Sequence, residues 1–274
     1  TKAEGGNFEN LETNPAPAVT DVTDTIDNST VSLKATPSAA EGGNVTYTAT
    51  VTAPVTGSPV VVTLANGEKI TIPVGETTGS VSISAPNDVL VGHTPLTNSI
   101  TNVSGGNYEN LVADKTPVST TVTDTVDTTS VSLTATGTVA EGGQITYTAT
   151  LTNAAGTPVT VTLSNGSVIH IEAGKTTGTV TVAAPADDVY IDAGKVNATI
   201  TNATGGNFEK LVTDTTPAVT NVTDTLDTTS VGISGSASVT EGQTASYTVS
   251  LTHPAQTEVT LKISYSGTAT DGSD

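Results

Sequence analysis

The sequence contains no cysteine, methionine or tryptophan, and aromatic residues make up only 3% of its 274 residues. The absence of cysteine excludes disulfide bonds, and the shortage of aromatic residues means that a hydrophobic core must be built from valine, isoleucine, leucine, alanine and a few tyrosines. Such a core is thin, and the Thr-, Gly- and Asn-rich composition is typical of extracellular β-proteins. Extracellular proteins without disulfides often gain stability from bound metal ions instead.

Basic residues are scarce as well: 8 Lys and Arg stand against 27 Asp and Glu, which gives a formal net charge of -19. This charge disfavours nucleic acid and anionic membrane surfaces as partners and favours cations. No apolar run approaches the roughly 18 residues of a membrane span, so we expect no membrane insertion of this segment. We find no nucleophile–base pair, phosphate-binding loop or set of spaced histidine ligands, and we therefore do not expect an enzyme.

The sequence does contain a long internal repeat. The motif Val-Thr-Asp-Thr-x-Asp occurs at Val22–Asp27, Val122–Asp127 and Val222–Asp227, at a spacing of 100 residues. This period is too long for a solenoid repeat and suits an independent β-sandwich domain. The acidic motif therefore marks the seam between successive domains.

The period divides the chain into four parts. Residues 1–28 are expected to be the tail of a preceding repeat, 29–127 and 128–227 two complete repeats, and 228–274 the beginning of a further repeat. Since both ends fall inside repeats, we expect the sequence to be a fragment of a longer chain.

Alternation of apolar and polar residues predicts strands throughout. Val45, Tyr47, Ala49 and Val51 alternate with threonines, and Asn66-Gly67 between two apolar runs is a hairpin signal. Each repeat shows about seven such strands and no helical period. We predict an all-β fold of tandem Ig-like Greek-key β-sandwich domains in an extended array. Tyr47 and its equivalents Tyr147 and Tyr247 are predicted to be core residues.

The regularly placed acidic residues fall in loops that share one end of a sandwich. If successive strands run in opposite directions, the loops after the first, third and fifth strands and the end of the seventh lie at the same pole, next to the following domain. In the first complete repeat these segments carry Glu41, Asp88, Asp124 and Asp127, and in the second they carry Glu141, Asp187, Asp188, Asp192, Asp224 and Asp227.

A cluster of carboxylates needs a compensating cation, since two charges about 4 Å apart at an effective dielectric constant near 20 repel by roughly 4 kcal/mol. Oxygen ligands from flexible loops suit Ca²⁺ better than Mg²⁺, and the lack of Cys and His in the predicted cluster argues against zinc. The alternative is that these acids are solubilising surface charges or turn residues. His93, His170 and His253 do not recur between repeats, and we predict that they are surface residues.

The repeated segments resemble those of a known group, the RTX adhesins of the LapA type, which are giant biofilm proteins exported by type I secretion. The resemblance rests on the seam Thr121–Val131, on Ala140–Gly143 and on the recurring Gly-Gly-Asn-Tyr/Phe-Glu turn. It implies Ig-like extender domains that bind Ca²⁺ near their junctions, at the bacterial cell surface, with outer-membrane anchoring through regions outside this sequence. The third repeat looks like a Calx-β-type unit, in which Glu241, Asp271 and Asp274 match acidic Ca²⁺ positions.

Two functions are compatible with the sequence. In the first, the repeats are a spacer that is stiffened by Ca²⁺ and contacts only neighbouring repeats of the same, monomeric chain. In the second, the repeats themselves bind glycan or self-associate. Near-identity of loops between repeats and the shortage of aromatic residues for stacking on sugars favour the spacer.

Overall fold

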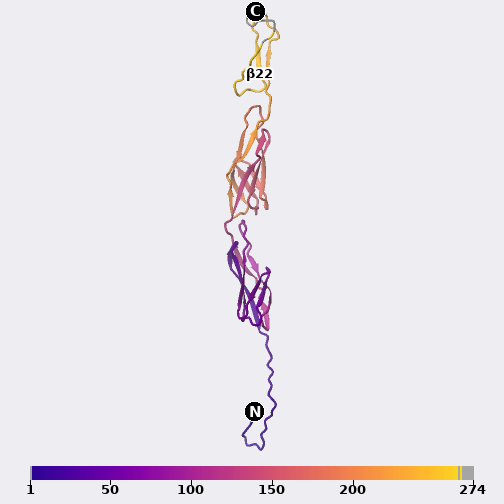
Figure 1. Ribbon diagram of the computed structural model, residues 1–274, viewed down its shortest axis with the longest axis vertical. Coiled ribbons are helices and arrows are strands. Elements are labelled where there is room, and N and C mark those ends of the chain that lie inside the picture. The colour runs from indigo at the N-terminus through magenta and orange to yellow at the C-terminus, as the bar shows by residue number, and fades with distance from the viewer. Residues whose placement is uncertain (1, 265, 267–274) are drawn as a thin grey trace. The chain divides into compact units, whose positions relative to one another are not determined.

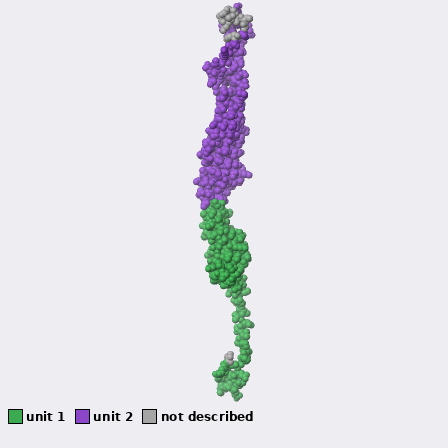
Figure 2. All heavy atoms as spheres, in the orientation of Figure 1, with its two compact units in different colours: residues 1–87, 92–124 green, residues 88–91, 125–274 purple. Residues whose placement is uncertain are grey.

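The described part of the chain consists of β-strands joined by turns and loops (Figure 1). The computed structural model describes residues 2–264 and residue 266, and within them it contains no helix, and hence none that could cross a membrane. The chain forms two compact units (Figure 2). Unit 1 comprises Thr1–Asn87 and Gly92–Asp124, and unit 2 comprises Asp88–Val91 and Thr125–Asp274.

Unit 1 contains one sandwich built from three sheets. Their strand orders are β6-β3-β1-β9, β2-β10-β7 and β5-β4-β8. The β1–β9 and β2–β10 pairs are parallel, and the other pairs are antiparallel. The strands are β1 (Asn28–Ala35), β2 (Ser38–Ala40), β3 (Asn44–Val51), β4 (Val60–Leu64), β5 (Lys69–Ile72), β6 (Thr78–Ser84), β7 (Leu96–Asn98), β8 (Ile100–Ser104), β9 (Asn110–Ala113) and β10 (Val118–Thr123).

Unit 2 repeats this arrangement in the sheets β16-β13-β11-β19, β12-β20-β17 and β15-β14-β18, and adds the hairpin β21-β22. The predicted all-β fold of tandem β-sandwiches is thus confirmed. The strands are β11 (Thr128–Ala135), β12 (Thr138–Ala140), β13 (Gln144–Leu151), β14 (Val159–Leu163), β15 (Val168–Ile171), β16 (Thr177–Ala183), β17 (Gly194–Ala198), β18 (Ile200–Gly205), β19 (Lys210–Thr213), β20 (Ala218–Thr223), β21 (Val231–Gly235) and β22 (Tyr247–Leu251).

Each sandwich has ten strands instead of the seven predicted, because three predicted strands are interrupted. In unit 1 the first breaks between β1 and β2, near Pro37, which has no N–H to donate to a ladder, and in unit 2 the same break falls at Thr136 and Gly137. Another breaks at Ser99, whose N–H donates to the side chain of Asn98 at 3.0 Å instead of to a strand. In unit 1 the last of them breaks at residues 114–117, between β9 and β10. Because of these breaks, each interrupted segment contributes its two strands to two different sheets, as β1 and β2 do.

The cores follow the predicted alternation. In β3 and β13 every second residue is buried, and Tyr47 and Tyr147 are among the largest fully buried side chains. The prediction for Tyr247 is wrong, since its side chain is 55% exposed. Tyr247 lies in the two-stranded sheet β21-β22, and in the described part of the third repeat no second sheet covers its face.

A hydrogen-bonded turn follows β9 and recurs after β19. Asp114 Oδ1 accepts hydrogen bonds from the backbone N–H of Thr116 at 3.0 Å and from its hydroxyl at 2.6 Å. Asp214 accepts the same backbone bond from Thr216 at 2.9 Å. The threonine hydroxyl and N–H lower the pKa of both aspartates, because they stabilise the charged carboxylate.

Candidate metal centre

The register of two parallel strands places the first two acidic residues of the site. Ala140, the last residue of β12, pairs with Thr223, the last residue of β20. Glu141 and Asp224 therefore leave the sheet side by side, and the N–H of Glu141 donates to the carbonyl of Thr223 at 3.0 Å. In unit 1 the equivalent pairing of Ala40 with Thr123 does the same for Glu41 and Asp124.

In unit 2 the loop after β16 brings further carboxylates to Glu141. One oxygen each from Glu141, Asp188 and Asp192 can be chosen so that all three lie within 4.8 Å of one another. The N–H of Asp188 donates to Glu141 Oε2 at 3.2 Å, and the N–H of Asp192 donates to Asp224 Oδ1 at 3.2 Å. These backbone contacts hold the loop and both strand ends around one point.

Glu141 is the electrostatically unusual member of this cluster. Only 7% of its surface is exposed, and its Oε1 atom has no hydrogen-bond partner among the described residues. Burial raises the pKa of Glu141, the N–H of Asp188 opposes the rise, and the hydrogen bond and charge of Asp224 and the charge of Asp192 add to it. Within the described residues, no ion pair joins a basic side chain to any of these four carboxyl groups.

This donor set fits a hard divalent cation. All its ligand atoms are oxygens, one of them buried and without a partner, and they come from loops rather than from a rigid helix. Calcium–oxygen distances are about 2.3–2.6 Å, so two ligands on opposite sides of a Ca²⁺ ion are about 4.8 Å apart. The three oxygens, which lie within 4.8 Å of one another, are therefore close enough to share one ion.

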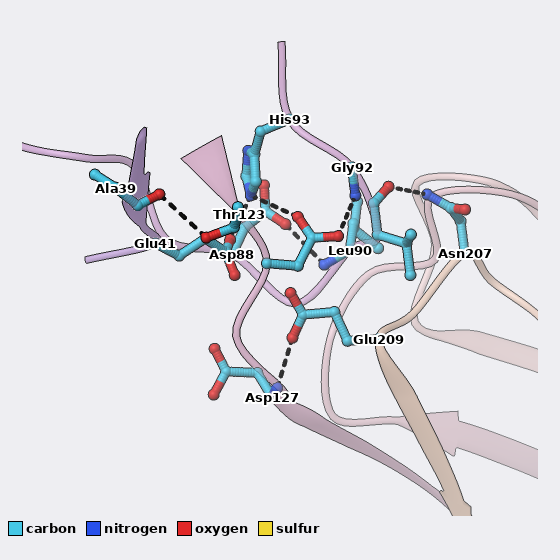
Figure 3. Close-up of polar contacts among 12 residues, drawn as sticks. Ala39, Glu41, Asp88, Leu90, Gly92, His93, Thr123, Asp127, Asn207 and Glu209 are labelled. Carbon is cyan, nitrogen blue, oxygen red and sulfur yellow. Dashed lines mark hydrogen bonds and ion pairs between the residues drawn. The ribbon is translucent and has the colours of Figure 1, made fainter. Parts of the chain in front are cut away.

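In unit 1 a histidine occupies the corresponding place, which corrects the prediction that His93 is a surface residue and that the cluster lacks histidine. Its side chain is only 11% exposed, and its Nε2 contacts the Glu41 carboxylate directly (Figure 3). The same Nε2 lies 3.9 Å from Asp124 Oδ1. Asp124 Oδ2 also accepts a hydrogen bond from the N–H of Gly92 at 2.8 Å. Position 193 is alanine, so the two units present different donor sets.

The other predicted acids lie as follows. Asp88 belongs to unit 2, where its Oδ1 accepts a hydrogen bond from the N–H of Leu90 at 2.7 Å. The Asp187 carboxylate accepts a hydrogen bond from the hydroxyl of Thr225. Asp227 and Glu241 are exposed, whereas Asp271 and Asp274 lie outside the described residues. The assignment of these side chains to a metal stays a prediction.

Sequence reasoning missed a glutamate that holds the seam. The N–H of Asp127 donates to Glu209 Oε2 at 2.5 Å (Figure 3). The N–H of Asp27 donates to Glu109 Oε2 at the same distance. The second aspartate of the first two seams is thus held by the sandwich that follows it. The signal was present, since a glutamate ends each copy of the Gly-Gly-Asn-Tyr/Phe-Glu turn.

The fold and the acidic loop cluster define a class of proteins, namely tandem all-β repeats with acidic residues clustered at one end of each sandwich. Comparison with protein families then matches the LapA domain at residues 27–125, 127–225 and 227–271, and the chain therefore belongs to the LapA domain family of adhesin repeats. This family is structural rather than enzymatic and is associated with the cell surface. A comparison with curated proteins gives no match.

Proposed function

We propose that this segment is a spacer of a bacterial cell-surface adhesin and that its repeats bind Ca²⁺ next to their seams. In this role the sandwiches separate a distal ligand-binding region from the cell. They serve attachment and biofilm formation without contacting the ligand themselves. Membership of an adhesin repeat family supports the spacer role, and the acidic cluster supports the calcium.

One observation carries the calcium part of this proposal, namely the buried Glu141 with its partnerless Oε1. A buried carboxylate surrounded by further carboxyl groups is unfavourable unless a cation offsets the charge. Glu141, Asp188, Asp192 and Asp224 would hold the ion, which would supply the missing positive charge. Hydrogen bonds from the loop N–H groups would orient two of these ligands before the ion arrives.

The position of Asp224 links this site to the seam. Asp224 follows β20 directly, and the seam residues Thr225–Asp227 follow Asp224. An ion held by Asp224 and by the loop after β16 would fix the first aspartate of the seam motif to the sandwich that precedes it. The hydrogen bond from Thr225 to Asp187 works in the same direction. Calcium would therefore reduce the torsional freedom of the seam and stiffen the array.

Two measurements test the proposal separately. Isothermal titration of the parent with Ca²⁺ should show binding that is lost at one site in Glu141→Gln and retained in the control Glu172→Gln, which changes an exposed glutamate outside the cluster. Small-angle scattering should show a narrower range of conformations in Ca²⁺ than in chelator. Absence of Ca²⁺ binding would contradict the metal site, whereas binding without any change in scattering would contradict only the stiffening. A molecular mass that rises with concentration in Ca²⁺ would favour self-association over the spacer.

A further inference from the structure

Unit 2 contains a short piece of chain that belongs, by sequence, to the repeat before it. The segment Asp88–Val91, which we name the clasp, comes from the long loop after β6, yet it groups with Thr125–Asp274. The chain therefore passes from one compact unit to the other at 87/88, 91/92 and 124/125. A simple linear array would need a single passage.

The clasp is hydrogen-bonded to a turn of unit 2 in the manner of an added strand. Leu90 and Phe208 form an antiparallel β-bridge. The N–H of Val91 donates to the carbonyl of Asn207 at 2.9 Å, and the N–H of Glu209 donates to the carbonyl of Val89 at 3.1 Å. The side-chain amide of Asn207 donates to the carbonyl of Val91 at 3.0 Å (Figure 3).

Apolar contacts accompany these bonds. Val89 and Leu90 pack against the hydrophobic core of unit 2, of which Phe208 is a buried member. A Cβ atom on Gly156 would lie 3.1 Å from Leu90 Cδ1 and 3.2 Å from Leu90 Cδ2. Glycine at this position therefore leaves the space that the leucine side chain fills. We name Gly156 together with the turn Gly205–Glu209 the socket.

Three copies of the turn in this chain show how burial changes with the clasp. Phe208, which is bridged to the clasp, is 9% exposed and belongs to the core. Tyr108 is half-buried and only packs against the edge of its core, and its turn has no such bridge in the part of the chain that the structure describes. Phe8, which has no described sandwich of its own, is 67% exposed. The aromatic side chain is most buried where a clasp is present.

We propose that the socket is a docking site for the apolar loop of the preceding repeat, so that each repeat completes the core of its successor. The partner is thus another copy of the repeat, recognised by backbone pairing and by one large side chain, which is Leu90 here and Tyr190 at the equivalent position of the second repeat. None of the contacts that carry this proposal is made by a carboxylate. The interaction would make the stability of a repeat depend on the repeat before it.

Hydrogen exchange at single amides tests the clasp in the whole chain in saturating Ca²⁺. The N–H of Glu209 should exchange more slowly than that of Glu109, its equivalent in the first repeat. Leu90→Ser should accelerate exchange at Glu209 by about 3- to 10-fold, the factor expected from exposing a half-buried leucine. The matched control Val91→Ser changes a side chain that is 50% exposed and should leave Glu209 protected. Equal exchange of Glu209 and Glu109 in the parent would overturn the proposal.

A disulfide between the two bridge positions gives a second measurement. Directly opposed residues of an antiparallel pair have the Cα separation that a disulfide requires. Because the chain has no cysteine, Leu90→Cys with Phe208→Cys places two thiols in a clean background. We expect an intramolecular disulfide under mild oxidation. Free thiols after oxidation, or disulfide-linked dimers in place of closed monomers, would contradict a clasp within one chain. If the parent does not bind Ca²⁺, the exchange and disulfide measurements still test the clasp, because both probe the contact between the clasp and the socket directly.

Discussion

The substitution Glu141→Gln should reverse the order of stability of parent and variant between calcium and chelator. In Ca²⁺ the parent gains the binding free energy of the site, and the variant loses the ligand that is most deeply buried. In chelator the parent carries a buried carboxyl group among other carboxyl groups, whereas the variant carries a neutral amide of the same shape. The variant should therefore unfold at a lower temperature than the parent in Ca²⁺ and at a higher temperature in chelator.

The size of both effects can be estimated. Calcium at a hundredfold excess over its Kd adds about 2.7 kcal/mol to the folded state. For a domain of this size, that corresponds to an increase of about 10–20 °C in Tm. The repulsion that the substitution removes in chelator acts between Glu141 and its neighbours Asp188 and Asp192, with one oxygen of each residue within 4.8 Å of the others. Two charges at that distance repel by about 1 kcal/mol in water and about 3.5 kcal/mol at a dielectric constant of 20.

Differential scanning calorimetry of parent, Glu141→Gln and the exposed control Glu172→Gln, each in Ca²⁺ and in chelator, measures this. The transition of unit 1, which keeps its own site, serves as an internal reference in every trace. The control should follow the parent in both buffers. Equal Ca²⁺-induced shifts in parent and Glu141→Gln would refute the assignment of Glu141 as a ligand. A variant less stable than the parent in chelator would refute the electrostatic argument.

Three further predictions concern single positions. Tyr147→Phe should stabilise the protein by about 1 kcal/mol in chemical denaturation, because the buried hydroxyl has no hydrogen-bond partner among the described residues, and a gain no larger than that of Tyr47→Phe would contradict this. Asp214→Asn should be less stable than the parent at neutral pH. Because the pKa of Asp214 is lowered in the folded state, the carboxylate's contribution to stability is fully present above the ordinary pKa of 3.8 and disappears as the pH falls through the folded-state value. A stability difference between parent and variant that persists in strong acid would exclude this cause. Gly156→Ala should lower the Tm, because the added Cβ would press against Leu90 of the clasp. The control Gly137→Ala, with no atom within 4 Å of its Cβ, should instead raise stability by about 0.4–1 kcal/mol. Equal effects of the two substitutions would argue against a tight socket.

The features that sequence predicted well depend on short periods and on strand direction. The alternation around Tyr47 and Tyr147 predicts their burial, because successive side chains of a strand point to opposite faces. The prediction that the loops of one pole meet placed Glu141 and Asp188 in one cluster. The prediction that Tyr247 is buried is wrong because burial needs a covering sheet as well as an alternating strand. The alternation within one strand contains no information about whether a second sheet covers it.

What sequence missed lies in positions where comparison of the repeats gives no guidance. His93 was set aside because it does not recur, although it lies in the same long loop as Asp88. The pairing of Leu90 with Phe208 joins residues far apart in sequence, and no local pattern specifies such a contact. The recurring glutamate of the Gly-Gly-Asn turn was visible, yet its role required knowing that the seam backbone passes beside it.

The division of residues between the two units has a consequence for how such arrays can grow. The boundaries of the sequence repeat differ from the boundaries of the folded unit. Asp88–Val91 belongs to one repeat in the sequence but folds with the next one. Duplication of a whole period places every loop in front of a matching turn, wherever in the period the cut falls. Insertion of an unrelated domain at a seam would leave one loop without its turn and one turn without its loop. Lengthening by internal copying therefore preserves the contact at every junction, whereas insertion of a foreign domain leaves the core of the following repeat incomplete.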